Sequence, residues 1–170
     1  MSPRLSIGII LFLILIGCNN FQTIILMADE EAVITQEGEI VKTIEGPKVK
    51  KISSKQKAHI IKKHSLRVYS YDSSLMKNIS ITLRWYVLNS NSYYHFSKDK
   101  QATDIKEILK SELDNAMISY DIYEISTIAK NQKTNKQFRN KNSEDIFQKL
   151  QVGVEKYGIK IHHILYAENS

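Results

Sequence analysis

Residues 79–88 read ISITLRWYVL, a stretch in which apolar and polar residues alternate almost perfectly. Because successive side chains of a β-strand point to opposite faces, this alternation predicts a strand with one apolar face. That face would carry Ile79, Ile81, Leu83, Trp85 and Val87, and the other face Ser80, Thr82, Arg84 and Tyr86. One apolar and one polar face are typical of an antiparallel sheet that is covered on one side only.

Shorter strand signals precede this segment. Residues 32–36 and 39–44 predict two strands joined at Glu37 and Gly38. Glycine suits that position because it tolerates the positive φ that a tight hairpin needs. Apolar residues between positions 60 and 68 predict one or two further strands.

Helical periodicity follows the long strand. Apolar side chains recur at helical spacing up to about Ser119, in a helix that Thr103 or Asp104 can cap. A second amphipathic helix follows Ser143, and Gly158 is a suitable residue for its C-terminal end. The remaining expectations are a turn at 89–92, a short helix at 122–128, a loop at 130–141 and a closing strand at 159–166.

These elements predict an α+β fold, with a small, mostly antiparallel sheet and two packed amphipathic helices behind an N-terminal membrane segment. We expect residues 1–28 to be the membrane anchor or signal peptide and residues 29–170 to form the domain. The chain has 170 residues, of which 42% are hydrophobic, enough for a real core. It has a single cysteine, so no intramolecular disulfide supports that core.

Two interpretations fit the N-terminus. Residues 5–17 are apolar or small apart from one serine, and Cys18 follows them directly. The run suits a signal peptide but is too short to span a bilayer, which takes ~20 residues. In one interpretation Cys18 is lipidated after cleavage, as in a lipoprotein. In the other, an uncleaved anchor continues to Ala28 and includes Asn19, Asn20 and Gln22, which are costly within a membrane. Both place the body of the chain on the extracytoplasmic side.

A strongly basic stretch runs from Lys48 to Arg67 and contains no acidic residue. Its cations are Lys48, Lys50, Lys51, Lys55, Lys57, Lys62, Lys63 and Arg67. Such a strip can bind anionic lipid head groups, at ~1 kcal/mol per residue near the surface, or can be a solvated strand face. The export signal argues against nucleic acid as a partner, although the net charge is +6.

Aromatic side chains near the long strand form a candidate partner-binding patch, because aromatic residues are enriched in interface hot spots. The patch would consist of Tyr86, Tyr93, Tyr94 and Phe96, unless these are ordinary core and edge residues. The adjacent His162 and His163 would point to opposite faces of a strand, so they predict no metal site. The chain has no nucleophile, phosphate-loop or zinc-protease motif, and we expect neither catalysis nor a cofactor.

Three short strings resemble the band 7 (SPFH) family of stomatins, prohibitins and bacterial HflC and HflK proteins. The first is EEAVITQEGEIV at 30–41, which is similar to the family's opening strand pair after its anchor. The second is RWYV at 84–87 followed by Tyr93-Tyr94, and the third is YGIKI at 157–161. Together with the order of the predicted elements, the resemblance covers residues 5–168 and is greatest for HflC-type proteins.

The resemblance implies a non-enzymatic membrane scaffold of the bacterial inner membrane. HflC-type proteins pair with HflK and regulate the membrane protease FtsH, so an HflK-like partner, an FtsH-type protease and an oligomer are the implied partners. Two features differ from the family. Gly46-Pro47 stands in reversed order, and the chain ends where relatives continue into an assembly helix. The alternative is a surface lipoprotein, lipidated at Cys18, with an unrelated binding function.

Overall fold

The computed structural model of the chain describes residues 20–72, 79–98, 102–135 and 138–168. It contains two compact units, whose described parts begin at residues 20 and 63. The boundary between the units, after Lys62, falls within residues 29–170, which we expected to form the domain. Each unit has its own sheets and is described by itself.

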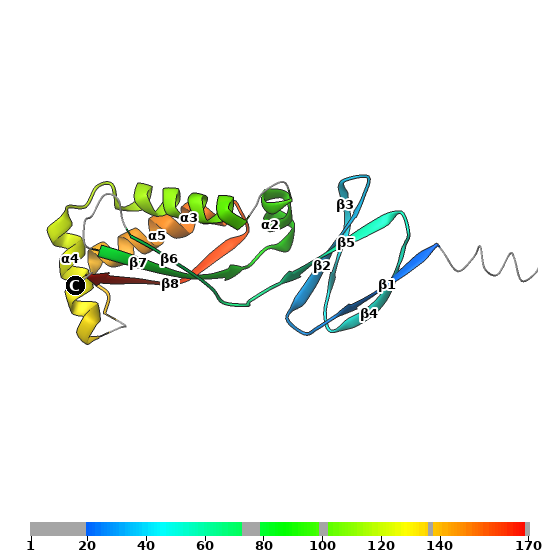
Figure 1. Cartoon of the computed structure of the whole chain (residues 1–170), viewed down its shortest axis with the longest axis horizontal. Helices are drawn as coiled ribbons and strands as arrows, with labels where there is room; N and C mark the ends of the chain where they lie inside the picture. The colour runs from blue at the N-terminus through cyan, green and yellow to red at the C-terminus, as the bar shows by residue number, and fades with distance from the viewer. Residues whose placement is uncertain (1–19, 73–78, 99–101, 136–137, 169–170) are drawn as a thin grey trace, which may run out of the picture. The chain divides into compact units, whose positions relative to one another are not determined.

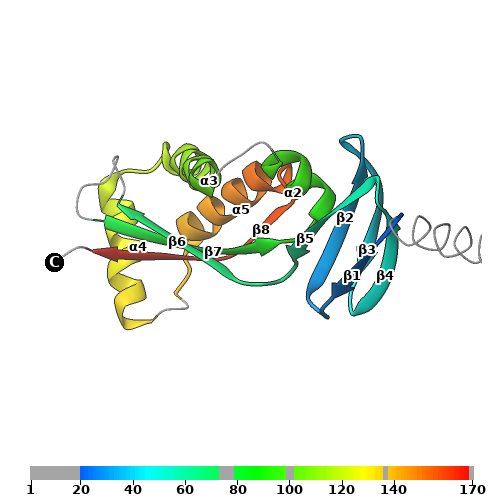
Figure 2. The same cartoon turned by 45° about the vertical axis from the view of Figure 1, so that its right-hand side comes forward.

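The first unit consists of five strands and contains no helix within its described residues. The strands are β1 (Phe21–Leu26), β2 (Glu30–Gln36), β3 (Glu39–Glu45), β4 (Lys48–Ser53) and β5 (Gln56–Lys62). β1 pairs with β4, while β2 lies between β3 and β5 in a second sheet (Figure 2). All three pairings are antiparallel. The core of the unit consists of Ile24, Leu26, Ala32, Ile34, Ile44 and Ile52, with Ala58 packed against it.

The predicted hairpin in this unit is confirmed. Glu37 and Gly38, which join β2 to β3, have φ values of 55° and 88°. Positive φ at both central residues is the conformation that matches a two-residue turn to the twist of its strands. Glycine adopts it at little cost, so the position of Gly38 is explained by the turn.

Strand β1 occupies residues that the longer anchor would have included. In β1, Ile24 and Leu26 are buried while Phe21 and Ile25 are exposed, which is the alternation of a strand with one face on the core. The longer anchor therefore differs from the structure at residues 21–26. Residues 5–19, including Cys18, lie outside the described residues.

The second unit contains a three-stranded antiparallel sheet. Its strands are β6 (Arg67–Asp72), β7 (Ile79–Val87) and β8 (Ile159–Glu168), and β7 lies in the centre. The predicted alternation of β7 is confirmed, because all five of its expected core side chains are at most 5% exposed. The closing strand is confirmed too, as β8, and continues two residues beyond the expected Tyr166.

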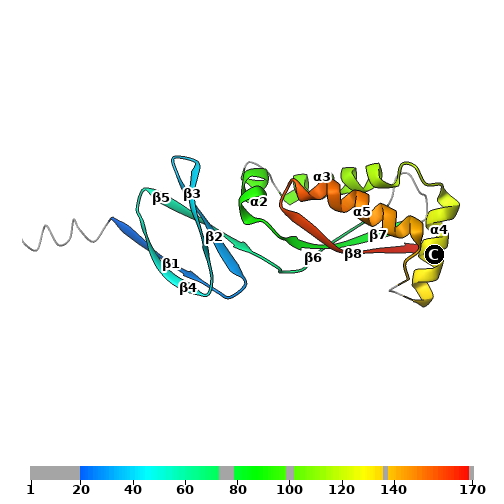
Figure 3. The same ribbon diagram turned by 180° about the vertical axis from the view of Figure 1, so that it is seen from behind.

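The described part of this unit also contains four helices. The sequence predicted two packed helices and a short third helix. The four helices are α2 (Ser90–Ser97), α3 (Ala102–Met117), α4 (Ile122–Thr134) and α5 (Lys141–Glu155). In Figure 1, α3 and α5 lie over the same face of the sheet, and Figure 3 shows this arrangement from behind. The buried side chains of β7 face this helical layer, so the α+β class and the antiparallel pairing are as predicted.

Three helix boundaries differ from the predictions, each for a local reason. The expected turn at 89–92 is the start of α2, where the side chain of Asn89 caps the helix by accepting from the N–H of Ser92. The expected loop at 130–141 is helical as far as Thr134. Helix α5 is capped by Asn140 rather than Ser143, and the two residues form a reciprocal capping box.

No helix within the described residues has the length and apolar content required to cross a membrane. The apolar run at 5–17 lies outside that part of the chain.

Gly158 connects the last helix to β8 through a close backbone approach. Its φ is +71°, and its carbonyl oxygen accepts hydrogen bonds from the N–H groups of Leu88 (2.9 Å) and Asn89 (3.1 Å). A Cβ atom at this position would overlap the backbone oxygen of Asn89 and lie 2.8 Å from the nitrogen of Tyr93. The end of β7 and the start of α2 therefore depend on this glycine.

We predict that Gly158→Ala lowers the free energy of unfolding by about 3 kcal/mol, because it combines a left-handed φ with a backbone clash. Urea unfolding followed by the fluorescence of Trp85, the only tryptophan, measures the change. Gly153→Ala in α5 is the matched control, since its Cβ would meet only the flexible side chain of Glu112. The control should change stability by less than ~1 kcal/mol. Equal effects of the two substitutions would contradict the prediction.

Candidate functional site

The eight cations of the basic stretch are divided among different elements. Lys48, Lys50 and Lys51 lie on β4, whereas Lys57 and Lys62 lie on β5, which belongs to another sheet. Lys55 lies in the turn between these strands, and Lys63 and Arg67 belong to the second unit. Within the first unit, Lys48, Lys50 and Lys51 share one strand and form a local group.

Arg67 contributes to the core edge of the second unit. Its guanidinium donates to the hydroxyl of Tyr93 at 2.6 Å and lies over the rings of Trp85 and Tyr93, at 4.9 and 5.1 Å from their centroids. A guanidinium stacked between aromatic rings keeps its charge while it covers apolar surface. We therefore assign this residue a packing role.

The aromatic patch has a largely internal position. Tyr93 and Tyr94 lie on α2 and are each 8% exposed, while Tyr86 and Phe96 are half-buried. The ring of Phe96 lies 4.5 Å from that of Tyr157, and the ring of Tyr86 lies 5.5 Å from that of His64. Most of this aromatic surface is used in packing within the second unit.

One face of the first unit combines apolar and basic side chains on its surface. We call it the β1–β4 outer face and define it by Phe21, Thr23, Ile25, Val49 and Lys51. Phe21, Ile25 and Val49 are 63%, 61% and 65% exposed, and Ile25 lies directly opposite Val49 in the strand pair. Met27, which follows β1, is exposed as well. Sequence reasoning missed this face because residues 21–26 were assigned to the longer anchor.

The inner edge of β4 borders a second basic surface. A pocket of about 530 Å³ is lined by three lysines and two glutamates, together with Thr43 and Ile44. The charged residues are Lys42, Lys48, Lys50, Glu31 and Glu45. Strand β4 therefore carries Lys48 and Lys50 toward this pocket and Lys51 on the β1–β4 outer face.

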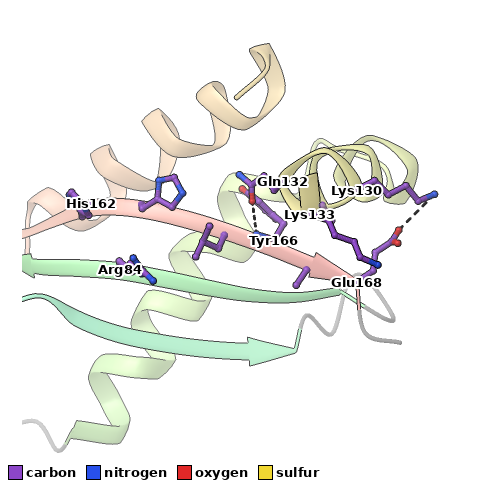
Figure 4. Close-up of a pocket in the computed structure, with 11 residues that line it drawn as sticks. Arg84, Lys130, Gln132, Lys133, His162, Tyr166 and Glu168 are labelled. Carbon is purple, nitrogen blue, oxygen red and sulfur yellow. Dashed lines mark hydrogen bonds and ion pairs between the residues drawn. The ribbon is translucent and has the colours of Figure 1, made fainter. Parts of the chain in front are cut away.

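The second unit has a larger pocket between α4 and β8. Its volume is about 650 Å³, within the range of sites for small ligands. Its charged lining residues are Arg84 of β7, Lys130 and Lys133 of α4, and Glu168 of β8 (Figure 4). Its other lining residues are Ala129, Gln132, His162, His163, Leu165, Tyr166 and Ala167. We refer to it as the α4–β8 pocket.

A β-bulge explains why both histidines line this pocket. The pairing of β7 with β8 joins Arg84 to His163 but Trp85 to Ile161, so His162 is an extra residue. Strict alternation would have placed His162 and His163 on opposite faces, as the sequence predicted. The bulge suspends the alternation, and both side chains line the pocket. Nevertheless, no group of three or more potential metal ligands occurs within the described residues.

Glutamine side chains hold α4 and α5 against the outer edge of β8. The amide of Gln132 accepts from the N–H of Tyr166 (2.9 Å) and donates to the carbonyls of Phe138 (3.2 Å) and Ile164 (3.5 Å). Gln151 of α5 makes the same pair of contacts nearer the start of β8. Its amide accepts from the N–H of Ile161 (2.9 Å) and donates to the carbonyl of Ile159 (3.5 Å). Each amide thus takes the place of a neighbouring strand. Gln132 is only 5% exposed and fixes one wall of the pocket to its floor.

Two tyrosines of the second-unit sheet have raised pKa values. Burial, and secondly the charge of Asp114, raise the pKa of Tyr71 far above its usual value. Burial likewise raises the pKa of Tyr166, whose hydroxyl has no hydrogen-bond partner among the described residues. Both groups therefore stay neutral at physiological pH.

Comparison of the sequence with protein-family models and with curated proteins finds no match. The functional interpretation of both surfaces therefore comes from their geometry and from the resemblance of the three short strings.

We predict that Gln132→Ala lowers the free energy of unfolding by about 2–4 kcal/mol. The substitution leaves the buried N–H of Tyr166 and the carbonyl of Ile164 without a partner, and it opens a cavity. Urea unfolding followed by Trp85 fluorescence measures the change. Gln148→Ala is the control, because Gln148 is exposed on α5 and bonds only Glu144, and should cost less than ~0.5 kcal/mol. A loss no greater than that of the control would show that the edge of β8 does not need the amide.

Proposed function

We propose that this chain is a non-enzymatic scaffold protein held at a membrane surface, with its β1–β4 outer face against the lipid head groups. The observation that carries the proposal is that face itself. It exposes Phe21, Ile25 and Val49 together with Lys51, immediately after the apolar run at 5–17. A membrane-bound N-terminus keeps β1 close to the lipid. An apolar and basic face there contributes favourable free energy of binding to the membrane surface.

Two energy terms favour this orientation. Exposed apolar side chains gain roughly 25 cal/mol for each Å² that they remove from water. Each lysine near an anionic surface adds ~1 kcal/mol, and the effect declines within a Debye length. Of the three β4 lysines, only Lys51 lies on the β1–β4 outer face with Val49, whereas Lys48 and Lys50 line the pocket on the other side of the strand. Of the cations in the basic stretch, we therefore propose only Lys51 as a direct contact of the anionic head groups.

The positions of the band 7-like strings support the scaffold role. The first string forms the β2–β3 hairpin, the second lies in the central strand β7, and the third contains Gly158 at the entry to β8. Each string thus coincides with a structural feature, namely the hairpin turn, the central strand or the glycine before β8. By the resemblance, we propose a bacterial inner-membrane location, an extracytoplasmic body, and an HflK-like protein and an FtsH-type protease as partners in an oligomeric complex.

We predict that a tryptophan introduced as Ile25→Trp lies close to lipid in the full chain reconstituted into vesicles that contain phosphatidylglycerol. Brominated acyl chains quench nearby tryptophans, so the new fluorescence should be strongly quenched. Ile60→Trp is the matched control, because Ile60 is also exposed but lies on β5 in the other sheet. Trp85 provides the common background, since it is only 5% exposed. Similar quenching at positions 25 and 60 would refute the proposed orientation.

The surface lipoprotein remains the second candidate, and the position of β1 favours it. Strand β1 begins at Phe21, so a helical span would have to end before that residue. Residues 5–19 are fewer than the ~20 that a bilayer span needs. Lipidation of Cys18 would attach the chain to the membrane through a short connection to β1, and the β1–β4 outer face would still lie near the lipid.

The intact mass of the membrane-extracted protein distinguishes the two candidates. If Cys18 is the lipidated first residue, the mass corresponds to a chain that starts at Cys18 and carries acyl groups. The Cys18→Ala variant should then show neither the cleavage nor the acylation. An uncleaved scaffold has an unprocessed mass that changes in the variant only by the substitution. In that case we also expect an HflK-like protein and an FtsH-type protease in the purified complex. Their absence would contradict the proposed partners but not the orientation of the face.

A further inference from the structure

We propose that the α4–β8 pocket binds an extended acidic peptide segment of a partner protein. The segment would place carboxylates at both ends of the pocket and small apolar side chains between them. The inference concerns a surface of the second unit and is independent of the membrane-facing role proposed above. It rests on the length of the pocket, the distribution of its charges and the rigidity of its walls.

The pocket is elongated along β8. Its floor includes lining residues from His163 to Ala167, and Arg84 lies opposite His163 in the strand pairing. The four residue-to-residue steps from His163 to Ala167 span about 13 Å. An extended peptide of four to five residues matches this length, whereas a single phosphate or carboxylate ion would contact only one end.

The charges lie toward the two ends of this floor. Arg84 is at the end marked by His163, whereas Lys130 and Lys133 extend from α4 toward Glu168 (Figure 4). Glu168 lies 3.8 Å from Lys130 and balances that charge. Arg84 and Lys133 form no ion pair with the described residues. The lining therefore has a net charge of +2 with neutral histidines, from three cations and one carboxylate.

The centre of the floor is apolar. Leu165 and Ala167 lie between the charged ends, and Ala129 contributes to the wall from α4. A compact inorganic anion gains nothing from this surface, but a peptide can cover it with small apolar side chains. The combination of separated cations and an apolar centre is therefore better matched by a peptide than by a small ion.

The walls of the pocket are fixed before any ligand binds. Gln132 lies between the two lysines in sequence and is hydrogen-bonded to the backbone of β8. Lys130 and Lys133 are three residues apart on the helix, so they project from neighbouring positions on its surface. Little ordering of the protein is needed on binding, which favours affinity for a short segment.

The test uses the full chain in detergent and a fluorescein-labelled peptide, Glu-Asp-Val-Ala-Val-Asp-Glu, with fluorescence anisotropy as the readout. The control peptide, Gln-Asn-Val-Ala-Val-Asn-Gln, has the same shape without the charges. The variant Arg84→Gln/Lys133→Gln removes the two cations that lack ion pairs. Its matched control is Lys98→Gln/Lys106→Gln, which makes the same change in net charge at the C-cap of α2 and on α3, outside the pocket lining. Thermal unfolding of each variant verifies that it is folded.

We expect the acidic peptide to bind the wild-type chain, and the pocket variant to weaken binding at least ~10-fold, as two lost charge contacts of ~0.7 kcal/mol each would. The control variant should change the affinity less than ~2-fold, and the uncharged peptide should not bind. Equal affinities of the two variants, or no binding to the wild-type chain, would overturn the proposal. Full displacement of the peptide by millimolar phosphate would also overturn it and would identify a small-anion site.

Discussion

The backbone along the outer edge of β8 must find hydrogen-bond partners, and the second unit is arranged around this need. β8 is the last strand of its sheet, so its N–H and carbonyl groups on that side have no neighbouring strand. The amides of Gln132 and Gln151 supply those partners from α4 and α5. The same two contacts therefore block further strand pairing and determine where the two helices lie. Of the two glutamines, Gln132 also lines the α4–β8 pocket.

Elements with a strong local pattern could be predicted from the sequence. The alternation at 79–87 and the Glu37-Gly38 turn each follow from a rule that involves only neighbouring residues. Strand β1 could not be predicted in this way, because its apolar residues continue those of the N-terminal run and need β4 as a partner. Residues 89–92 predict a turn but begin helix α2, because Asn and Ser are favoured both in turns and as helix caps, and only the fold decides between them.

The candidate functional surfaces were harder to predict than the fold. The basic stretch is continuous in sequence, but a turn sends its lysines onto β4 and β5, which belong to different sheets. Conversely, Arg84, Lys133 and Glu168 are far apart in sequence and meet at one pocket. No local signal marks such a site, because it depends on the pairing of β7 with β8 and on the path of α4. Charge density along a chain is thus a poor guide to charge density on its surface.

The bulge in β8 has an evolutionary consequence. Ile159 and Ile161 before it, and Ile164 and Tyr166 after it, all face the core, although the two pairs differ in parity. Without the extra residue, the side chains on one side of the bulge would have their core and solvent faces exchanged. Insertions and deletions are normally excluded from a buried strand. Here the extra residue is His162, which is exposed and lines the pocket, so a substitution at this position changes the pocket lining without changing a core side chain.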